Sequence, residues 1–190
     1  MNQDILSFNK VEYCKYGTIL TGVIIINKCK MQQNIENVEK LKGLVNNIGI
    51  AMLITVNAAK ELKARPITTA DIDTDGNMWF FTDEFSDKAE EISLNNEVMI
   101  NYAAPALKKY ISIQGNASLI NDVDQIKELW SPAFKVWFPE GETDDSVILL
   151  KVTPLHIEYW DGGSSKIIVS STTGDAYKKK GNKNWQPLYY

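Results

Sequence analysis

Thr82, Ser86 and Lys88 are the residues of this sequence whose types and spacing best suit chemistry. They belong to the segment TDGNMWFFTDEFSDKAEEISL, residues 74–94, in which an aromatic strand ends at Thr82 and a short helix opens a few residues later. The free N–H groups and the dipole at a helix N-terminus favour negative charge, and two hydroxyls and an ammonium add further donors. The segment therefore predicts a phosphate site. The alternative is that Ser86 only caps the helix and Lys88 is only solvated; both interpretations can hold together, because an N-cap site is also an anion site.

Arg65-Pro66-Ile67-Thr68 is a second candidate for binding. Arginine is a rigid five-donor fork that suits a phosphate or the edge of an electron-rich heterocycle. Pro66 leaves neighbouring backbone groups unpaired, so the N–H and C=O groups of Ile67 can face a planar ligand. The alternative is an edge-strand arginine paired with a carboxylate.

Gln114 and Trp160 are weaker candidates on later strands. Gln114 can donate to a heterocycle edge, and the alternative is an outward-facing glutamine. Trp160 precedes Gly162-Gly163 and can stack on a ligand or donate to it; the alternative is packing at the end of a barrel. His156 is the only histidine, so the sequence offers no histidine-based metal cluster, and we assign His156 no role.

Composition narrows the class of protein. The chain has 190 residues and a net charge of -4, and its one concentrated basic run is Lys178-Lys179-Lys180, which argues against a nucleic-acid partner. No apolar stretch reaches the ~20 residues that span a bilayer, so we expect no membrane segment. Cys14 and Cys29 lack the spacing of metal ligands, and the chain from Met31 onward has no cysteine. This usage is consistent with the reducing cytoplasm.

Three regions differ in character. Residues 1–30 combine a polar start with one apolar decamer, and we expect an N-terminal appendage there, or a start codon assigned too early. Residues 31–163 carry the periodic patterns of a folded domain. Residues 164–190 are polar, and we expect a partly ordered tail.

The domain reads as several strands joined by tight turns, with few and short helices. Such a pattern predicts an antiparallel sheet that closes into a small barrel. Pro154 is expected to break the last strand in two. The helices are predicted over residues 34–46, 87–94 and 122–130, an irregular aromatic and acidic loop over 134–145, and the strands over 48–56, 65–71, 77–82, 98–103, 110–121, 146–153 and 155–160.

Five motifs in this order resemble one known family. They are ARPI at residues 64–67, WFFTD-x-x-S-x-K at 79–88, N-N-x-V at 95–98, W-F-P-E-G at 137–141 and P-x-x-I-E-Y-W-x-G-G at 154–163. From about Met31 to Gly163 the chain resembles the FMN-binding split-barrel proteins, and it is most similar to the general stress protein branch of the pyridoxamine phosphate oxidase-like superfamily.

The resemblance implies a mainly β (α+β) fold, a six-stranded antiparallel split β-barrel with a few flanking helices. It also implies a homodimer that holds two FMN molecules in clefts between its subunits, and the cysteine usage makes a cytoplasmic protein the expectation. Any oxidoreductase chemistry would be the flavin's own, with NADH or NADPH as candidate electron donors. Carried over residue by residue, the flavin contacts are Arg65, Pro66, Ile67 and Thr68 along the ring and ribityl edge, Thr82, Ser86 and Lys88 at the phosphate, and Gln114 and Trp160 from the partner subunit.

The chain departs from true pyridoxamine phosphate oxidases at three places. Asp87 stands where they carry a second basic residue, Ala70 stands where they carry a lysine, and Ser164-Ser165-Lys166 replaces their Arg-x-His element. We therefore expect a looser hold on FMN and no oxidation of pyridoxamine phosphate. Two alternatives stay open: a non-catalytic stress module that binds flavin or another small ligand, and a structural dimer with a degenerate site.

Overall fold

The computed structural model describes residues 37–161 and 164–168. Residues 37–46 are helical, which confirms the described part of the predicted first helix. The predicted appendage 1–30, the start of that helix, Gly162-Gly163 and most of the predicted tail lie outside the described residues.

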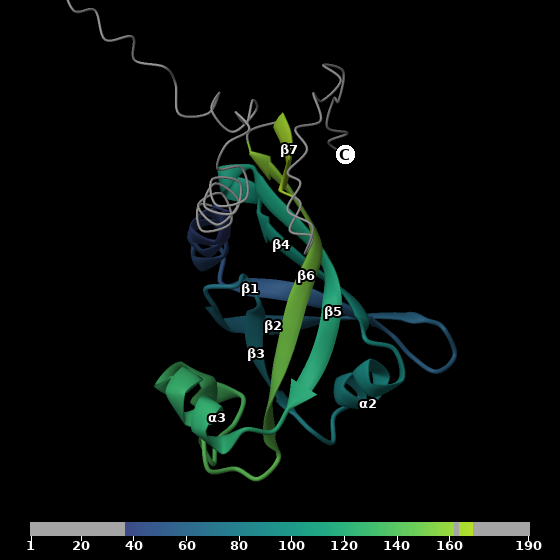
Figure 1. Ribbon diagram of the computed structural model, residues 1–190, viewed down its shortest axis with the longest axis vertical. Helices are drawn as coiled ribbons and strands as arrows, with labels where there is room; N and C mark the ends of the chain where they lie inside the picture. Colours follow the sequence, from purple (N-terminus) through teal and green to yellow (C-terminus); the bar gives the residue numbers. More distant parts are fainter. Residues whose placement is uncertain (1–36, 162–163, 169–190) are drawn as a thin grey trace, which may run out of the picture.

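The strands form one antiparallel sheet that closes on itself (Figure 1). Its order is β3-β2-β1-β4-β5-β6-β7, and a further pairing between β3 and β6 closes the first six strands into a barrel, as predicted. A seventh strand, β7, pairs with β6 inside the segment predicted to be a tail. The strands are β1 (Ile50–Val56), β2 (Leu62–Ile72), β3 (Met78–Asp83), β4 (Glu97–Ala104), β5 (Lys109–Ile120), β6 (Val147–Asp161) and β7 (Ser164–Ile168).

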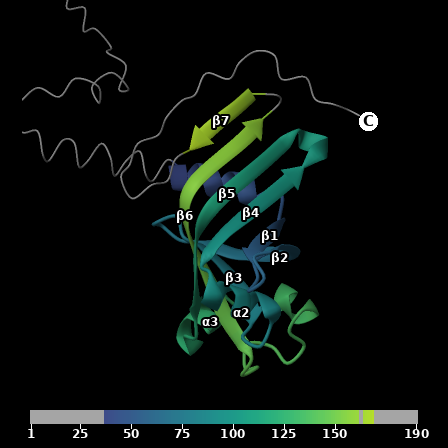
Figure 2. The same ribbon diagram turned by 90° about the vertical axis from the view of Figure 1, so that its right-hand side faces the viewer.

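Successive side chains along β1 point alternately into the barrel and toward its outer face. Ala51, Leu53 and Thr55 are buried and point inward, whereas Ile50 and Met52 are exposed on the outer face. The inner positions of the other strands build one apolar cluster, which the first helix joins through Val38, Leu41 and Val45. Figure 2 shows β4, β5, β6 and β7 side by side in the upper half of the molecule.

Four short helical segments follow the first helix within the described residues. The 3-10 helix η1 (Pro105–Leu107) joins β4 to β5, and α2 (Asp87–Leu94) and α3 (Val123–Leu129) lie toward one end of the barrel in both views. Asp122 caps α3, because its side chain accepts hydrogen bonds from the N–H groups of Asp124 and Gln125. The predicted irregular loop holds part of a second 3-10 helix, η2 (Pro132–Val136).

The expected break at Pro154 is wrong, because β6 runs without interruption from Val147 to Asp161. Pro154 opposes Gly115 on β5, and the register shifts there, so that Gln114 pairs with His156 and Leu155 is the extra residue of a bulge. A bulge tolerates a residue without an N–H group, which is why proline does not end this strand. Because β6 is unbroken, it pairs with β3 and β5 in the barrel and also with β7.

Candidate functional site

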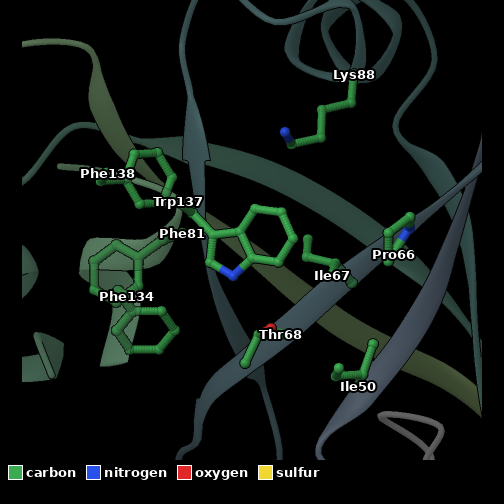
Figure 3. Close-up of a pocket in the computed structure, with 9 residues that line it drawn as sticks. All are labelled: Ile50, Pro66, Ile67, Thr68, Phe81, Lys88, Phe134, Trp137 and Phe138. Atoms are coloured by element: carbon green, nitrogen blue, oxygen red, sulfur yellow. The ribbon is translucent and has the colours of Figure 1, made fainter. Parts of the chain in front are cut away.

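A cavity of about 170 Å³ lies on the outside of the barrel, between strand β2, helix α2 and the η2 segment (Figure 3). Its walls are mostly apolar, and Lys88 is the one charged residue among the described residues that line it. The lining residues are Ile50, Pro66, Ile67, Thr68, Phe81, Lys88, Phe134, Trp137 and Phe138.

Lys88 is a half-buried cation that no carboxylate of the described residues neutralises at ion-pair distance. Burial lowers the pKa of Lys88, the positive charge of Arg65 lowers it further, and Asp83 acts in the opposite direction. A desolvated ammonium without a partner favours an anion at its side, because the anion would replace the lost hydration. The cavity can therefore hold a ligand with an apolar body and a negative group.

Ser86 lies at the N-cap position of α2 but does not cap it with its side chain. Its hydroxyl instead donates to the carbonyl of Asp83 at 2.6 Å. Thr82 lies beside it, with its oxygen 3.4 Å from the Ser86 hydroxyl, and is 0% exposed. The structure thus brings together the two predicted hydroxyls at the start of α2, but Thr82 is covered, and any effect of Thr82 on a ligand passes through Ser86.

Arg65 does not line the cavity; its side chain belongs to a partly buried network that joins β2 to β1 and α2. One guanidinium nitrogen donates to Glu91 at 2.7 Å and to the hydroxyl of Thr55 at 3.1 Å. Thr55 also donates to Glu91, which is buried, and the hydrogen bond from Arg65 is the main cause that lowers the pKa of Glu91. The pairing of Arg65 with a carboxylate, left open by the sequence, is thus what the structure shows.

Pro66, Ile67 and Thr68 line the cavity, in keeping with their predicted place beside a planar ligand. Gln114 and Trp160 do not line the cavity of the single chain.

Gln114 and Trp160 do, however, share an outer face with part of that cavity. Directly opposed residues of an antiparallel pair lie on one face, and three rows of such pairs cross the sheet. These rows are Thr68–Ile50, Ala64–Ile54–Met99–Gln114–His156 and Ala103–Tyr110–Trp160. The strand register therefore puts Gln114 and Trp160 on the face to which Thr68 and Ile50 belong.

The aromatic side chains that form one wall of the cavity, here called the aromatic wall, were not predicted from the sequence. Phe134, Trp137 and Phe138 come from the segment read as an irregular loop, and Phe81 comes from β3. The signal was present in the aromatic density of that loop and in its W-F-P-E-G motif, which carried no assigned role.

The sequence matches the family model described as pyridoxamine 5'-phosphate oxidase like over residues 36–183. The chain belongs to this family. No protein of curated function is similar enough to match.

Solved structures show the same fold. A Clostridium acetobutylicum protein related to general stress protein 26 of Bacillus subtilis has a TM-score of 0.62 at 16% identity, over 71% of this chain and 95% of that one. General stress protein 26 of Bacillus anthracis has a TM-score of 0.59 at 21% identity, over 69% and 98%. The general stress FMN/FAD binding protein of Xanthomonas citri has a TM-score of 0.57 at 22% identity, over 80% and 99%.

Two further findings concern the described residues alone. None of the helices within them has the length and apolar character needed to cross a membrane. Nor do these residues contain a group of three or more acidic, histidine or cysteine side chains that could hold a metal ion.

Proposed function

We propose that this protein binds FMN at the cavity beside α2 and acts as a flavin-dependent oxidoreductase of the cytoplasm with an unassigned substrate. The observation that carries the proposal is Lys88, a half-buried cation with no ion-pair partner among the described residues, set against apolar walls. The donors fit the group, because a phosphate of charge near -2 needs an ammonium, a hydroxyl and free helix N–H groups. Lys88, Ser86 and the start of α2 would hold the phosphate, and Pro66, Ile67 and Thr68 would lie along the ring.

The size of the cavity supports a site shared between two copies of the chain. Ligand pockets usually span ~300–1000 Å³, and the cavity of the single chain holds about 170 Å³. Gln114 and Trp160 lie on an outer face that includes Thr68 and Ile50 of the cavity wall, and a second copy seated on that face would bring its own Gln114 and Trp160 toward the ligand. We therefore propose a homodimer with a flavin site in each of two clefts.

When bound, the flavin would supply the hydride or electron transfer, and NADH or NADPH are the proposed donors. The protein would bind the ring, orient it and limit its contact with water. Ser164-Ser165-Lys166 stands where the resemblance would place the Arg-x-His element that grips the substrate's phosphate, so we do not propose pyridoxamine phosphate as the substrate. The name of the Xanthomonas citri protein, which joins stress with FMN or FAD binding, supports a role in the stress response.

A second candidate function is a stress module that binds flavin or another small ligand without turnover. Lys88 and the cavity support ligand binding as such, and apart from Lys88, which we assign to the phosphate, the described residues of the cavity walls include no titratable side chain. Anaerobic mixing of the FMN-bound protein with NADH and NADPH separates the two functions. Bleaching of the flavin absorbance supports the oxidoreductase, and a flavin that stays oxidised supports the binding module.

Titration with FMN tests the site itself. We expect Lys88→Ala to weaken FMN binding at least about tenfold and Lys88→Arg to retain most of it, because charge-assisted hydrogen bonds contribute roughly 1.5–3 kcal/mol. A bound phosphate would also raise the lowered pKa of Lys88, so the affinity of the unaltered protein should fall as the pH rises through the lowered value in the free protein. Lys88→Arg should not show this alkaline loss. A protein that stays colourless and binds no FMN in titration would remove the proposal.

A further inference from the structure

Trp137 is exposed in a way that its surroundings do not explain. Its side chain is 62% exposed, although it lines the cavity, and large aromatic residues are highly buried on average. No other aromatic ring of the described residues stacks on it. In Figure 3 its indole lies across the middle of the cavity view, with Lys88 on one side and Thr68 on another.

The segment that carries Trp137 is fixed firmly to the barrel. The N–H groups of Trp137 and Phe138 both donate to the carbonyl of Phe134, at 2.9 and 3.0 Å. The ring of Phe134 packs on Phe81 of β3 with centroids 4.7 Å apart, and Phe138 lies 6.5 Å from the same ring. The two phenylalanines that flank Trp137 thus anchor it, and the indole is held at the cavity without being buried by it.

We propose that Trp137 packs against the isoalloxazine ring of the flavin and determines the preference of this site for a planar aromatic ligand. The inference rests on the proposed function, and it assigns a ring contact to a residue outside the set carried by the resemblance. An indole offers a large, flat and rigid surface, and ring stacking is favourable without reading any particular polar edge. Lys88 and Trp137 then divide the ligand between them: the cation takes the phosphate, and the indole takes the ring.

Comparison of FMN with riboflavin separates these two roles, because riboflavin has the same ring and lacks the phosphate. We expect Trp137→Ala to weaken both ligands by the same factor, about tenfold, and Trp137→Phe to weaken both about threefold. Lys88→Ala should weaken FMN and leave riboflavin nearly unchanged. Contact with an indole also quenches flavin fluorescence, so FMN bound to Trp137→Ala should be brighter than FMN bound to the unaltered protein.

Val136→Ala is the matched control. Val136 is the neighbour of Trp137, is 79% exposed and does not line the cavity, so its replacement should change neither affinity nor brightness. Size-exclusion chromatography of each variant reports whether the oligomeric state has changed.

Three results would overturn the inference while leaving FMN binding intact in the unaltered protein. One is an unchanged affinity and brightness in Trp137→Ala. Another is a loss that affects FMN and spares riboflavin. The third is a loss that accompanies dissociation of the protein into monomers, which would place Trp137 at a contact between subunits. A protein that binds neither ligand would overturn the proposed function and this inference together.

Discussion

At the scale of single residues, the charge of the site depends on how Arg65 and Glu91 pair. Two cations lie near the start of α2, but the carboxylate of Glu91 compensates Arg65, so Lys88 is the cation available to a ligand. The positive charge of Arg65 still reaches Lys88 and contributes to its lowered pKa. The network therefore leaves the site weakly basic, which gives a physical reason for the expected looser hold on a doubly charged phosphate.

We expect Glu91→Gln to lower the free energy of unfolding at pH 7 by about 2 kcal/mol, because Arg65 would lose its partner anion at a largely buried position. The pKa of Glu91 is lowered in the folded protein, chiefly by the hydrogen bond from Arg65. The contribution of the pair is thus fully present above the ordinary value of 4.5 and is lost as the pH falls through the lowered value.

Urea unfolding at pH 7 and at about pH 3 checks this expectation. The difference between the two proteins should be full at pH 7 and smaller in acid. Glu90→Gln is the control, since Glu90 is the exposed neighbour on the same helix and its replacement should change stability by less than about 0.5 kcal/mol. A difference that is equal at both pH values would contradict the assignment of the effect to the ionised pair.

At the scale of elements, the bulge between β5 and β6 depends on Gly115, which lies opposite Pro154. A β-carbon added at Gly115 would lie 2.6 Å from the carbonyl oxygen of Thr153 and 2.9 Å from the side chain of Val152. Because a backbone oxygen cannot withdraw without disturbing the bulge, we expect Gly115→Ala to destabilise the protein by about 1–3 kcal/mol in urea unfolding.

Gly43→Ala is the same type of substitution, but we expect it to change stability in the opposite direction. Gly43 lies inside the first helix, and a β-carbon added there would meet no atom of the described residues within 4 Å. We expect a gain of about 0.5–1 kcal/mol from the lower backbone entropy of the unfolded chain and the better helix propensity of alanine. Similar effects of the two alanines would show that the close approach at Gly115 does not govern the stability of the bulge.

The same elements show what a sequence can predict. The strands and α3 lie close to their predicted bounds, because the apolar run of β1, the alternation along β5 and the capping residue type of Asp122 are local patterns of the sequence. The predicted strand break at Pro154 is wrong because the residue that accommodates the proline, Gly115, lies on another strand. A proline considered alone signals a break, and only the cross-strand partner shows that it sits in a bulge.

The residues of the candidate site likewise fall into those that local motifs predict and those that depend on distant partners. Pro66, Ile67, Thr68 and Lys88 lie at the cavity, since they belong to short motifs whose spacing survives in the fold. The ion pair of Arg65 with Glu91 could not be derived, because it joins a strand to a helix far along the chain.

The aromatic wall that holds Trp137 comes from a loop without periodicity. Composition alone marked that loop as unusual, and its position against β3 depends on ring packing that no local pattern encodes.

At the scale of the whole molecule, the outer face of β1, β4 and β5 is the surface that we propose for the contact between two copies. It exposes four large apolar residues, namely Ile50, Met52, Met99 and Tyr110, each at least 40% exposed. The cross-strand register connects them to Gln114 and Trp160. An apolar face beside a small ligand cavity is the arrangement that a shared site between two copies would require.

We expect Met99→Asp to dissociate the proposed homodimer, because it would bury a carboxylate without a partner beside Gln114. The dimer dissociation constant should rise at least about 100-fold, which equals roughly 2.7 kcal/mol, and FMN affinity should fall with it because each site needs both copies. Sedimentation velocity with FMN titration at matched protein concentrations measures both quantities. Val123→Asp is the control, since Val123 is exposed at the first residue of α3, where a carboxylate favours the helix. If Met99→Asp remained a dimer, this face would not be the subunit contact, and if it became a monomer that bound FMN at full strength, the cavity of one chain would suffice for the flavin.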